Sequence, residues 1–113
     1  MNLVDDGMPP DLRFGTVFYI EKFGPFKDPT LLLLSANSGC EDKLVLVVSG
    51  GHKRGSLLQV LPLEAHTSAT SISRMWVIEN WSKWIDIYSS AESVIIIPDI
   101  LEAMKFREHR EES

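Results

Sequence analysis

The sequence predicts a single α+β domain, 1–113, in the order β-β-β-β-α-β-α: a mainly antiparallel sheet of about five strands with two helices on one face. Three observations support this fold class. Five short runs of leucine, aromatic and β-branched residues are separated by glycine, proline and asparagine, as in strands joined by turns. The stretch 73–87 instead repeats its apolar residues at helical spacing. A chain of 113 residues, of which 44% are hydrophobic, is also long enough to fill one core.

The strands are predicted from the leucine-rich and β-branched runs. Residues 1–11 contain Gly7, Pro9 and Pro10 without periodicity, so they are predicted to form a loose N-terminal arm. Strands are then predicted at 12–23, 30–35, 44–48, 56–61 and 93–97. The run of four leucines within 30–35 predicts a strand that is buried on both faces. Because the connectors between 30 and 61 are too short for crossover helices, these three runs are expected to form an antiparallel meander.

The stretch 73–87 contains all three tryptophans and is predicted to be an amphipathic helix. At about 100° per residue its apolar stripe comprises Val77, Ile78, Trp81, Trp84 and Ile85. The opposite, water-facing side comprises Glu79, Ser82, Lys83 and Asp86. Trp76 lies on a flank of the stripe, beside Asn80 and Ile87.

Hydroxyl and proline residues predict where the elements on either side of this helix begin and end. A polar connector, 62–71, precedes the helix, whose N-cap is expected to be Thr70, Ser71 or Ser73. A turn is predicted at 88–92. Pro98 ends the last strand, and a second, shorter helix is predicted from Asp99 to about residue 108, with its apolar side formed by Ile100, Leu101 and Met104. The charged tail, 109–113, is expected to fray.

Charge and composition argue against several classes of function. The net charge is −5 and the only basic cluster is 52–54, so direct binding to nucleic acid is not expected. The longest apolar runs, 31–34 and 94–97, are too short to span a bilayer, so no membrane insertion is expected. A single cysteine and an N-terminus without the apolar core of a secretory signal indicate a cytoplasmic location.

The reactive residue types do not form a catalytic pattern. Cys40 could act as a nucleophile with His52 or His66 as base, but Glu41 and Asp42 beside it disfavour the thiolate. The three histidines, the third being His109, lie on different predicted elements, so no metal or other cofactor is expected. The glycine-rich segment 49–56 lacks the residue order of a phosphate-binding loop and precedes no helix. The chain is therefore not expected to be an enzyme.

The stretch WVIENWSKWI (76–85), preceded by the meander and followed by VIIIP (94–98), resembles the small immunity-protein families of bacterial polymorphic-toxin systems. The leucine-rich strand after FGPFKDP (23–29) is a second similarity. The resemblance covers mainly 75–98. It implies a cytoplasmic protein that binds and neutralises the cognate toxin domain encoded beside it. It does not imply which residues contact the toxin, because such interfaces differ from pair to pair.

Two surfaces are candidates for contact with a protein partner: an acidic hairpin tip and the outward side of the tryptophan helix. Trp76 would be an interface anchor if it is half-exposed, and it would also permit a homodimer in place of a monomer. The predicted contact residues are Glu41, Asp42, Trp76, Glu79, Lys83 and Asp86. The alternative is a small regulatory or ligand-binding module with a pocket between sheet and helix, lined by Trp81 and Trp84.

Overall fold

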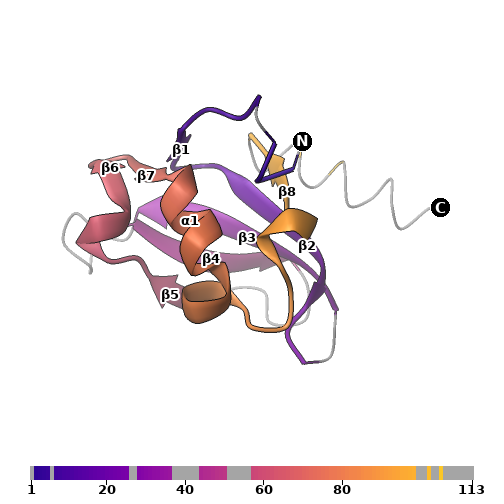
Figure 1. The fold of residues 1–113 in the computed structure, drawn as a ribbon. Coiled ribbons are helices and arrows are strands. Elements are labelled where there is room, and N and C mark those ends of the chain that lie inside the picture. The colour runs from indigo at the N-terminus through magenta and orange to yellow at the C-terminus, as the bar shows by residue number, and fades with distance from the viewer. Residues whose placement is uncertain are drawn as a thin grey trace.

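Five antiparallel strands form the main sheet of the computed structural model, in the spatial order β5-β4-β3-β2-β8 (Figure 1). The structure describes residues 2–5, 7–25, 28–36, 44–50 and 57–98, together with Glu102 and Lys105. The strands are β2 (Val17–Phe23), β3 (Asp28–Ala36), β4 (Leu44–Gly50), β5 (Leu57–Val60) and β8 (Ile95–Ile97). The predicted meander is confirmed, since each strand from β2 to β5 pairs with the next. The last strand, β8, returns to pair with β2.

A second, three-stranded sheet was not predicted. It consists of β1 (Asp11–Arg13), β6 (His66–Ser68) and β7 (Ser71–Ser73), with β7 in the centre. The prediction of one strand over 12–23 is wrong because Gly15, with a φ of 95°, turns the chain between β1 and β2. The prediction of a plain connector over 62–71 is also wrong, since this segment holds a 3-10 turn, Leu63–Ala65, all of β6 and the first residue of β7. Strands of three residues are too short to show an alternating pattern.

The predicted tryptophan helix is confirmed in position and start. Helix α1 (Arg74–Asn80) begins after Ser73, whose Oγ accepts a 3.1 Å hydrogen bond from the backbone N–H of Trp76. It continues into a π-helical turn, Trp81–Ile85. Nearly all of the second predicted helix, 99–108, lies outside the described residues. The arrangement of two helices on one face is therefore not confirmed.

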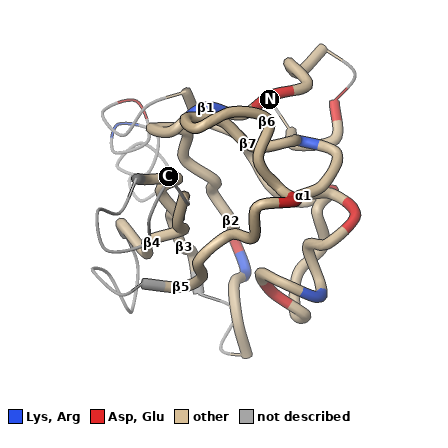
Figure 2. Tube along the Cα trace, turned by 90° about the vertical axis from the view of Figure 1, so that its left-hand side faces the viewer, with Lys and Arg blue, Asp and Glu red and all other residues tan. Residues whose placement is uncertain are grey.

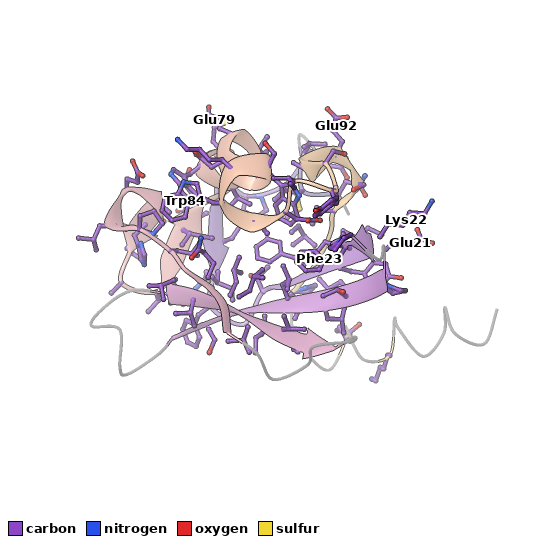
Figure 3. The ribbon with its side chains drawn as sticks, turned by 90° about the horizontal axis from the view of Figure 1, so that it is seen from below. Glu21, Lys22, Phe23, Glu79, Trp84 and Glu92 are labelled. Carbon is purple, nitrogen blue, oxygen red and sulfur yellow. The ribbon has the colours of Figure 1, made fainter. Side chains whose placement is uncertain are left out.

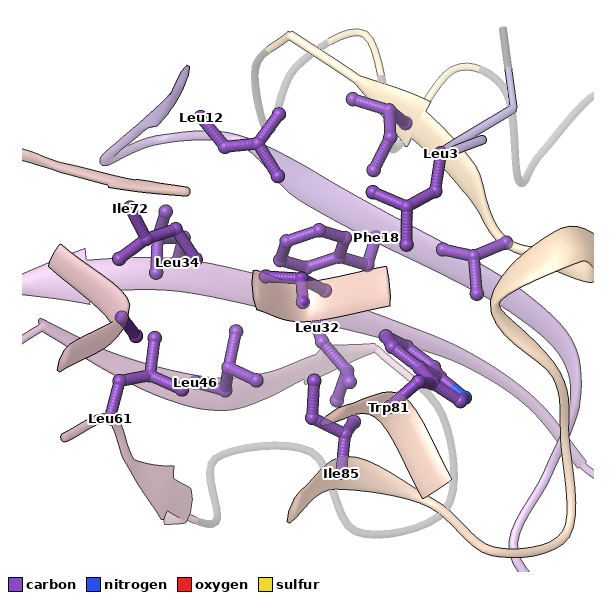
Figure 4. Packing of buried hydrophobic residues seen from close by; sticks show 14 of the residues in the cluster. Leu3, Leu12, Phe18, Leu32, Leu34, Leu46, Leu61, Ile72, Trp81 and Ile85 are labelled. Carbon is purple, nitrogen blue, oxygen red and sulfur yellow. The ribbon is translucent and has the colours of Figure 1, made fainter. Parts of the chain in front are cut away.

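The helix packs on one face of the main sheet and fills the core with the indole of Trp81 (Figure 4). Trp81 is 2% exposed, and its ring meets that of Phe18 from β2 edge-on, with centroids 6.4 Å apart and planes inclined by 60°. Val77 and Ile85 are buried in the same cluster, and Ile78 and Trp84 pack against it. The predicted apolar stripe is therefore confirmed.

The main sheet is apolar on its other face as well. Val17, Tyr19, Leu31 and Ile97 form a second buried cluster there, at positions that alternate with those of the first. The predicted burial of the leucine run on both faces is confirmed for three of its four residues: Leu31 is 2% exposed and Leu32 and Leu34 are fully buried, whereas Leu33 is partly buried.

The described part of the N-terminal segment is attached to the domain and is not the loose arm that the sequence predicted. Leu3 is fully buried in the main core, and its N–H donates to the carbonyl of Val94 at 2.9 Å. The carbonyl of Leu3 accepts a hydrogen bond of 2.9 Å from Nη1 of Arg74. The sequence did not indicate this attachment, because Leu3 stands alone and is not part of a periodic apolar pattern. Its burial and these hydrogen bonds hold the segment against β8 and α1.

The central position of Trp81 gives the first testable prediction. Trp81→Ala is expected to lower the free energy of unfolding by about 3–5 kcal/mol, because it removes the largest core side chain and leaves a cavity. Urea denaturation followed by circular dichroism measures this loss. Ser82→Ala, at an exposed position of the same turn, is the control and should change stability by less than about 0.5 kcal/mol. A loss below about 1 kcal/mol for Trp81→Ala would contradict this account of the core.

Candidate binding surface

Two indole rings, those of Trp76 and Trp84, pair at the edge of the helix and are both half-buried. Their centroids are 5.7 Å apart and their planes are inclined by 55°. The carbonyl of Trp84 accepts a 3.2 Å hydrogen bond from Nε2 of Gln59, which ties this edge of the helix to β5. Trp76 is thus partly exposed and also packs against the core, and its role as an interface anchor stays a prediction.

The outward side of the helical segment carries two further predicted contact residues. Glu79 and Lys83 are exposed, and neither forms an ion pair with any other described residue. Glu79 projects away from the main sheet, on the same side as Glu92 (Figure 3). Two more predicted contact residues, Glu41 and Asp42, lie outside the described part of the chain. The structure therefore places Trp76, Glu79 and Lys83 on one continuous helical segment, α1 and its π-helical turn.

Asp86 does not lie on the exposed side, and this prediction is corrected. Its side chain is buried, with 7% exposed. The helical wheel fails here because the helix ends in a π-helical turn, which the N–H of Asp86 closes on the carbonyl of Trp81 at 3.0 Å. Asp86 itself has φ −156° and ψ 119°, so the chain leaves the helix in an extended conformation and the carboxylate turns inward.

The Asp86 carboxylate accepts three hydrogen bonds that fix the turn after the helix. The hydroxyl of Ser89 donates to Oδ2 at 2.6 Å, and the N–H of Gly24 donates to the same oxygen at 3.2 Å. The N–H of Tyr88 donates to Oδ1 at 3.2 Å. The Ser89 hydroxyl also accepts a 3.1 Å bond from Nε1 of Trp81. These donors replace water around the buried charge and connect the core, the turn and the β2–β3 connection.

His66, one of the two candidate bases, has both ring nitrogens engaged by the backbone. Nε2 accepts a 2.9 Å hydrogen bond from the N–H of Leu44, so Nδ1 carries the proton and donates to the carbonyl of Pro62, also at 2.9 Å. Neither nitrogen is free to take a proton from a nucleophile. Cys40 and His52 lie outside the described residues. His66 therefore joins the start of β4 to the end of β5.

The described residues line a groove of about 950 Å³, which lies in a different place from the predicted ligand pocket. It lies along the small sheet, between β1, the β6–β7 turn and the end of β8, and no tryptophan lines it. Trp81 itself fills the space between helix and sheet. This groove is therefore not the predicted pocket lined by Trp81 and Trp84, which stays a prediction.

Charged and metal-ligating groups are dispersed over the described chain. Its lysines and arginines lie singly on different elements (Figure 2). No three histidine, cysteine or acidic side chains within the described ranges are grouped closely enough to hold a metal ion. Among the same residues, no helix has the length and apolar character needed to cross a bilayer.

Two exposed hydrophobic residues of the turn were missed by the sequence reasoning. Ile87 is 73% exposed and Tyr88 is 53% exposed, whereas the sequence placed Ile87 beside the apolar stripe. A usable signal was the order Asp86, Tyr88, Ser89, because an aspartate often accepts from the N–H two residues later and so forms a turn. The helical periodicity obscured this local signal.

The comparisons with known proteins identify a family. The family model described as Immunity protein 45 matches residues 8–96, which include the meander, the small sheet, the tryptophan helix and the return to β8. No curated protein and no solved structure matches the chain.

The hydrogen bonds of Asp86 give a second prediction. Asp86→Ala is expected to destabilise the protein by about 1–3 kcal/mol, because it leaves the N–H groups of Gly24 and Tyr88 without their acceptor. Thermal and urea unfolding measure the change. Glu92→Ala is the control, since it removes an exposed carboxylate that forms no hydrogen bond with the described chain. Equal stability of the two variants would show that the buried carboxylate does not brace the turn.

Proposed function

The chain belongs to the Immunity protein 45 family, and we propose that it binds a cognate toxin domain and neutralises it by covering the surface through which the toxin acts. The match over residues 8–96 carries this proposal. The protein would act as a stoichiometric inhibitor in the bacterial cytoplasm, without chemistry, cofactor or direct nucleic-acid contact of its own. It would reach the toxin as a monomer or a homodimer.

The outward side of the tryptophan helix supplies the contact surface that we favour. Trp76 offers a large half-exposed ring, and Glu79 and Lys83 offer charges that no described residue neutralises. Glu41 and Asp42 are proposed to add an acidic hairpin tip. Asp86 is buried, so its proposed contribution is indirect, through the turn that it holds.

Steric occlusion is the mechanism that this surface supports. A tight complex requires about 800 Å² of buried surface on each partner, with a few buried anchors near the centre. Glu79 and Glu92 project from the same side of the molecule (Figure 3), and the whole chain has a net charge of −5. Glu79 and Glu92 favour basic groups on the part of the toxin that they face, and the net negative charge favours faster association with such groups at low ionic strength.

The experiment is co-expression with the C-terminal domain that the adjacent gene encodes. We expect cells to survive only when the two are expressed together, and the two chains to co-purify in a fixed ratio. Persistent toxicity and the absence of a complex would overturn the proposed function.

A pair of variants tests the proposed helix surface. Glu79→Lys and Trp76→Ala are each expected to weaken the complex by about tenfold or more, because one reverses a contact charge and the other removes an aromatic anchor. Isothermal titration calorimetry measures the affinity, and circular dichroism verifies the fold. Asp11→Lys is the control, since it makes a similar charge change at an exposed position of β1. Wild-type affinity in both variants would exclude this side as the contact surface.

A further inference from the structure

The turn after the tryptophan helix exposes two consecutive large hydrophobic side chains. Ile87 is 73% exposed and Tyr88 is 53% exposed. The other large hydrophobic residues of similar exposure in the described chain stand singly on separate elements: Phe14, Leu63 and Met75. Single exposed apolar residues are ordinary on soluble proteins, whereas two adjacent ones form a continuous apolar projection.

This projection is held from both sides by buried polar contacts. The Asp86 carboxylate immediately before it accepts from the N–H of Tyr88 and from the hydroxyl of Ser89, which follows it. The same carboxylate accepts from the N–H of Gly24, in the connection between β2 and β3. Ser89 is in turn hydrogen-bonded to Trp81 in the core. The backbone of the turn is thus fixed on the core and on the neighbouring strand connection.

Burial of the Asp86 carboxylate costs free energy, and the packing of the core does not explain why this cost is accepted. Burying a carboxylate is unfavourable, and its hydrogen bonds only offset that penalty. The arrangement does not bring Ile87 or Tyr88 into the core; it holds both side chains in water. Fixing the backbone that carries exposed hydrophobic side chains before binding reduces the entropy that is lost when a complex forms. Tyrosine is also enriched among the residues that dominate interface energies.

The charges near the turn indicate the kind of partner. Lys22 lies just before Gly24 and projects from the end of β2 (Figure 3), and Lys83 lies just before the end of the helix. Both are exposed and form no ion pair with a described residue. In a contact that places this turn at the two-fold axis between two copies of the chain, these cations would approach their own counterparts and repel them. A different protein, with an apolar pocket and carboxylates at its rim, fits the turn better.

We propose that Ile87 and Tyr88 form a preformed anchor that inserts into an apolar, acid-rimmed pocket of the toxin domain. This inference rests on the proposed function and adds a contact site that the helix surface does not include. It also gives Asp86 a positioning role: the carboxylate holds the anchor without touching the toxin.

The test uses the full chain and, as probe, the purified C-terminal domain encoded by the adjacent gene. The double variant Ile87→Ser/Tyr88→Ser is expected to bind this domain about 30-fold or more weakly than the wild type, because both anchors are lost. Its melting temperature should stay within about 2 °C of the wild type, since both side chains are exposed. Leu63→Ser is the matched control: Leu63 is 66% exposed on the 3-10 turn before β6, and its loss should change the affinity by less than about threefold.

The outcomes separate this inference from the proposed function. If the wild type binds the domain and the double variant binds equally well, the proposed anchor role of Ile87 and Tyr88 is wrong, whereas the proposed function is retained. If the wild type does not bind the domain at all, the proposed function and the anchor both fall. If gel filtration shows that the wild type dimerises and the double variant does not, the turn is a contact between copies and the anchor is also overturned.

Discussion

The indole of Trp81 joins the hydrophobic core to the polar turn beyond the helix. The positions of the helix and of this turn both depend on it. Its ring packs edge-on against Phe18 in the central part of the main sheet. Its Nε1 donates to Ser89, which donates to the buried Asp86 carboxylate. One side chain therefore fixes the helix on the sheet through apolar contact and the following turn through hydrogen bonds. The surface that we propose for toxin binding is built on this connection.

The π-helical turn determines which side chains reach the solvent at the end of the helix. It lets Trp81 and Ile85 stay in the core while the chain leaves the helix in an extended conformation at Asp86. A regular α-helix would have carried Asp86 to the outer side. Because Asp86 points inward, its carboxylate holds the turn by hydrogen bonds and is not available as a surface charge. Ile87 and Tyr88, which follow it, are left exposed.

Much of the main sheet and the helix could be predicted because each has a strong local pattern. The leucine and β-branched runs marked five strands, and the spacing of the tryptophans marked the buried side of the helix. The small sheet could not be predicted, because its strands of three residues depend on pairing between Leu12 and Ile72, which are far apart in the sequence. The burial of Leu3 likewise depends on a distant contact, with Val94.

The binding surface was predicted in part, for a similar reason. Trp76, Glu79 and Lys83 lie on the helical segment where periodicity placed them, but the inward orientation of Asp86 also depends on a hydrogen bond from the N–H of Gly24, which is far away in the sequence. The acidic tip, Glu41 and Asp42, stays a prediction. The family gives the class of partner, whereas the contact surface follows only from which side chains the helix and its turn expose.

Hydrogen–deuterium exchange of the protein, alone and with the domain encoded by the adjacent gene, tests the central claim most directly. The account predicts that binding slows exchange in residues 74–89, with the strongest protection at the turn around Ile87 and Tyr88. Protection confined to the small sheet and its groove, with residues 74–89 unchanged, would contradict it.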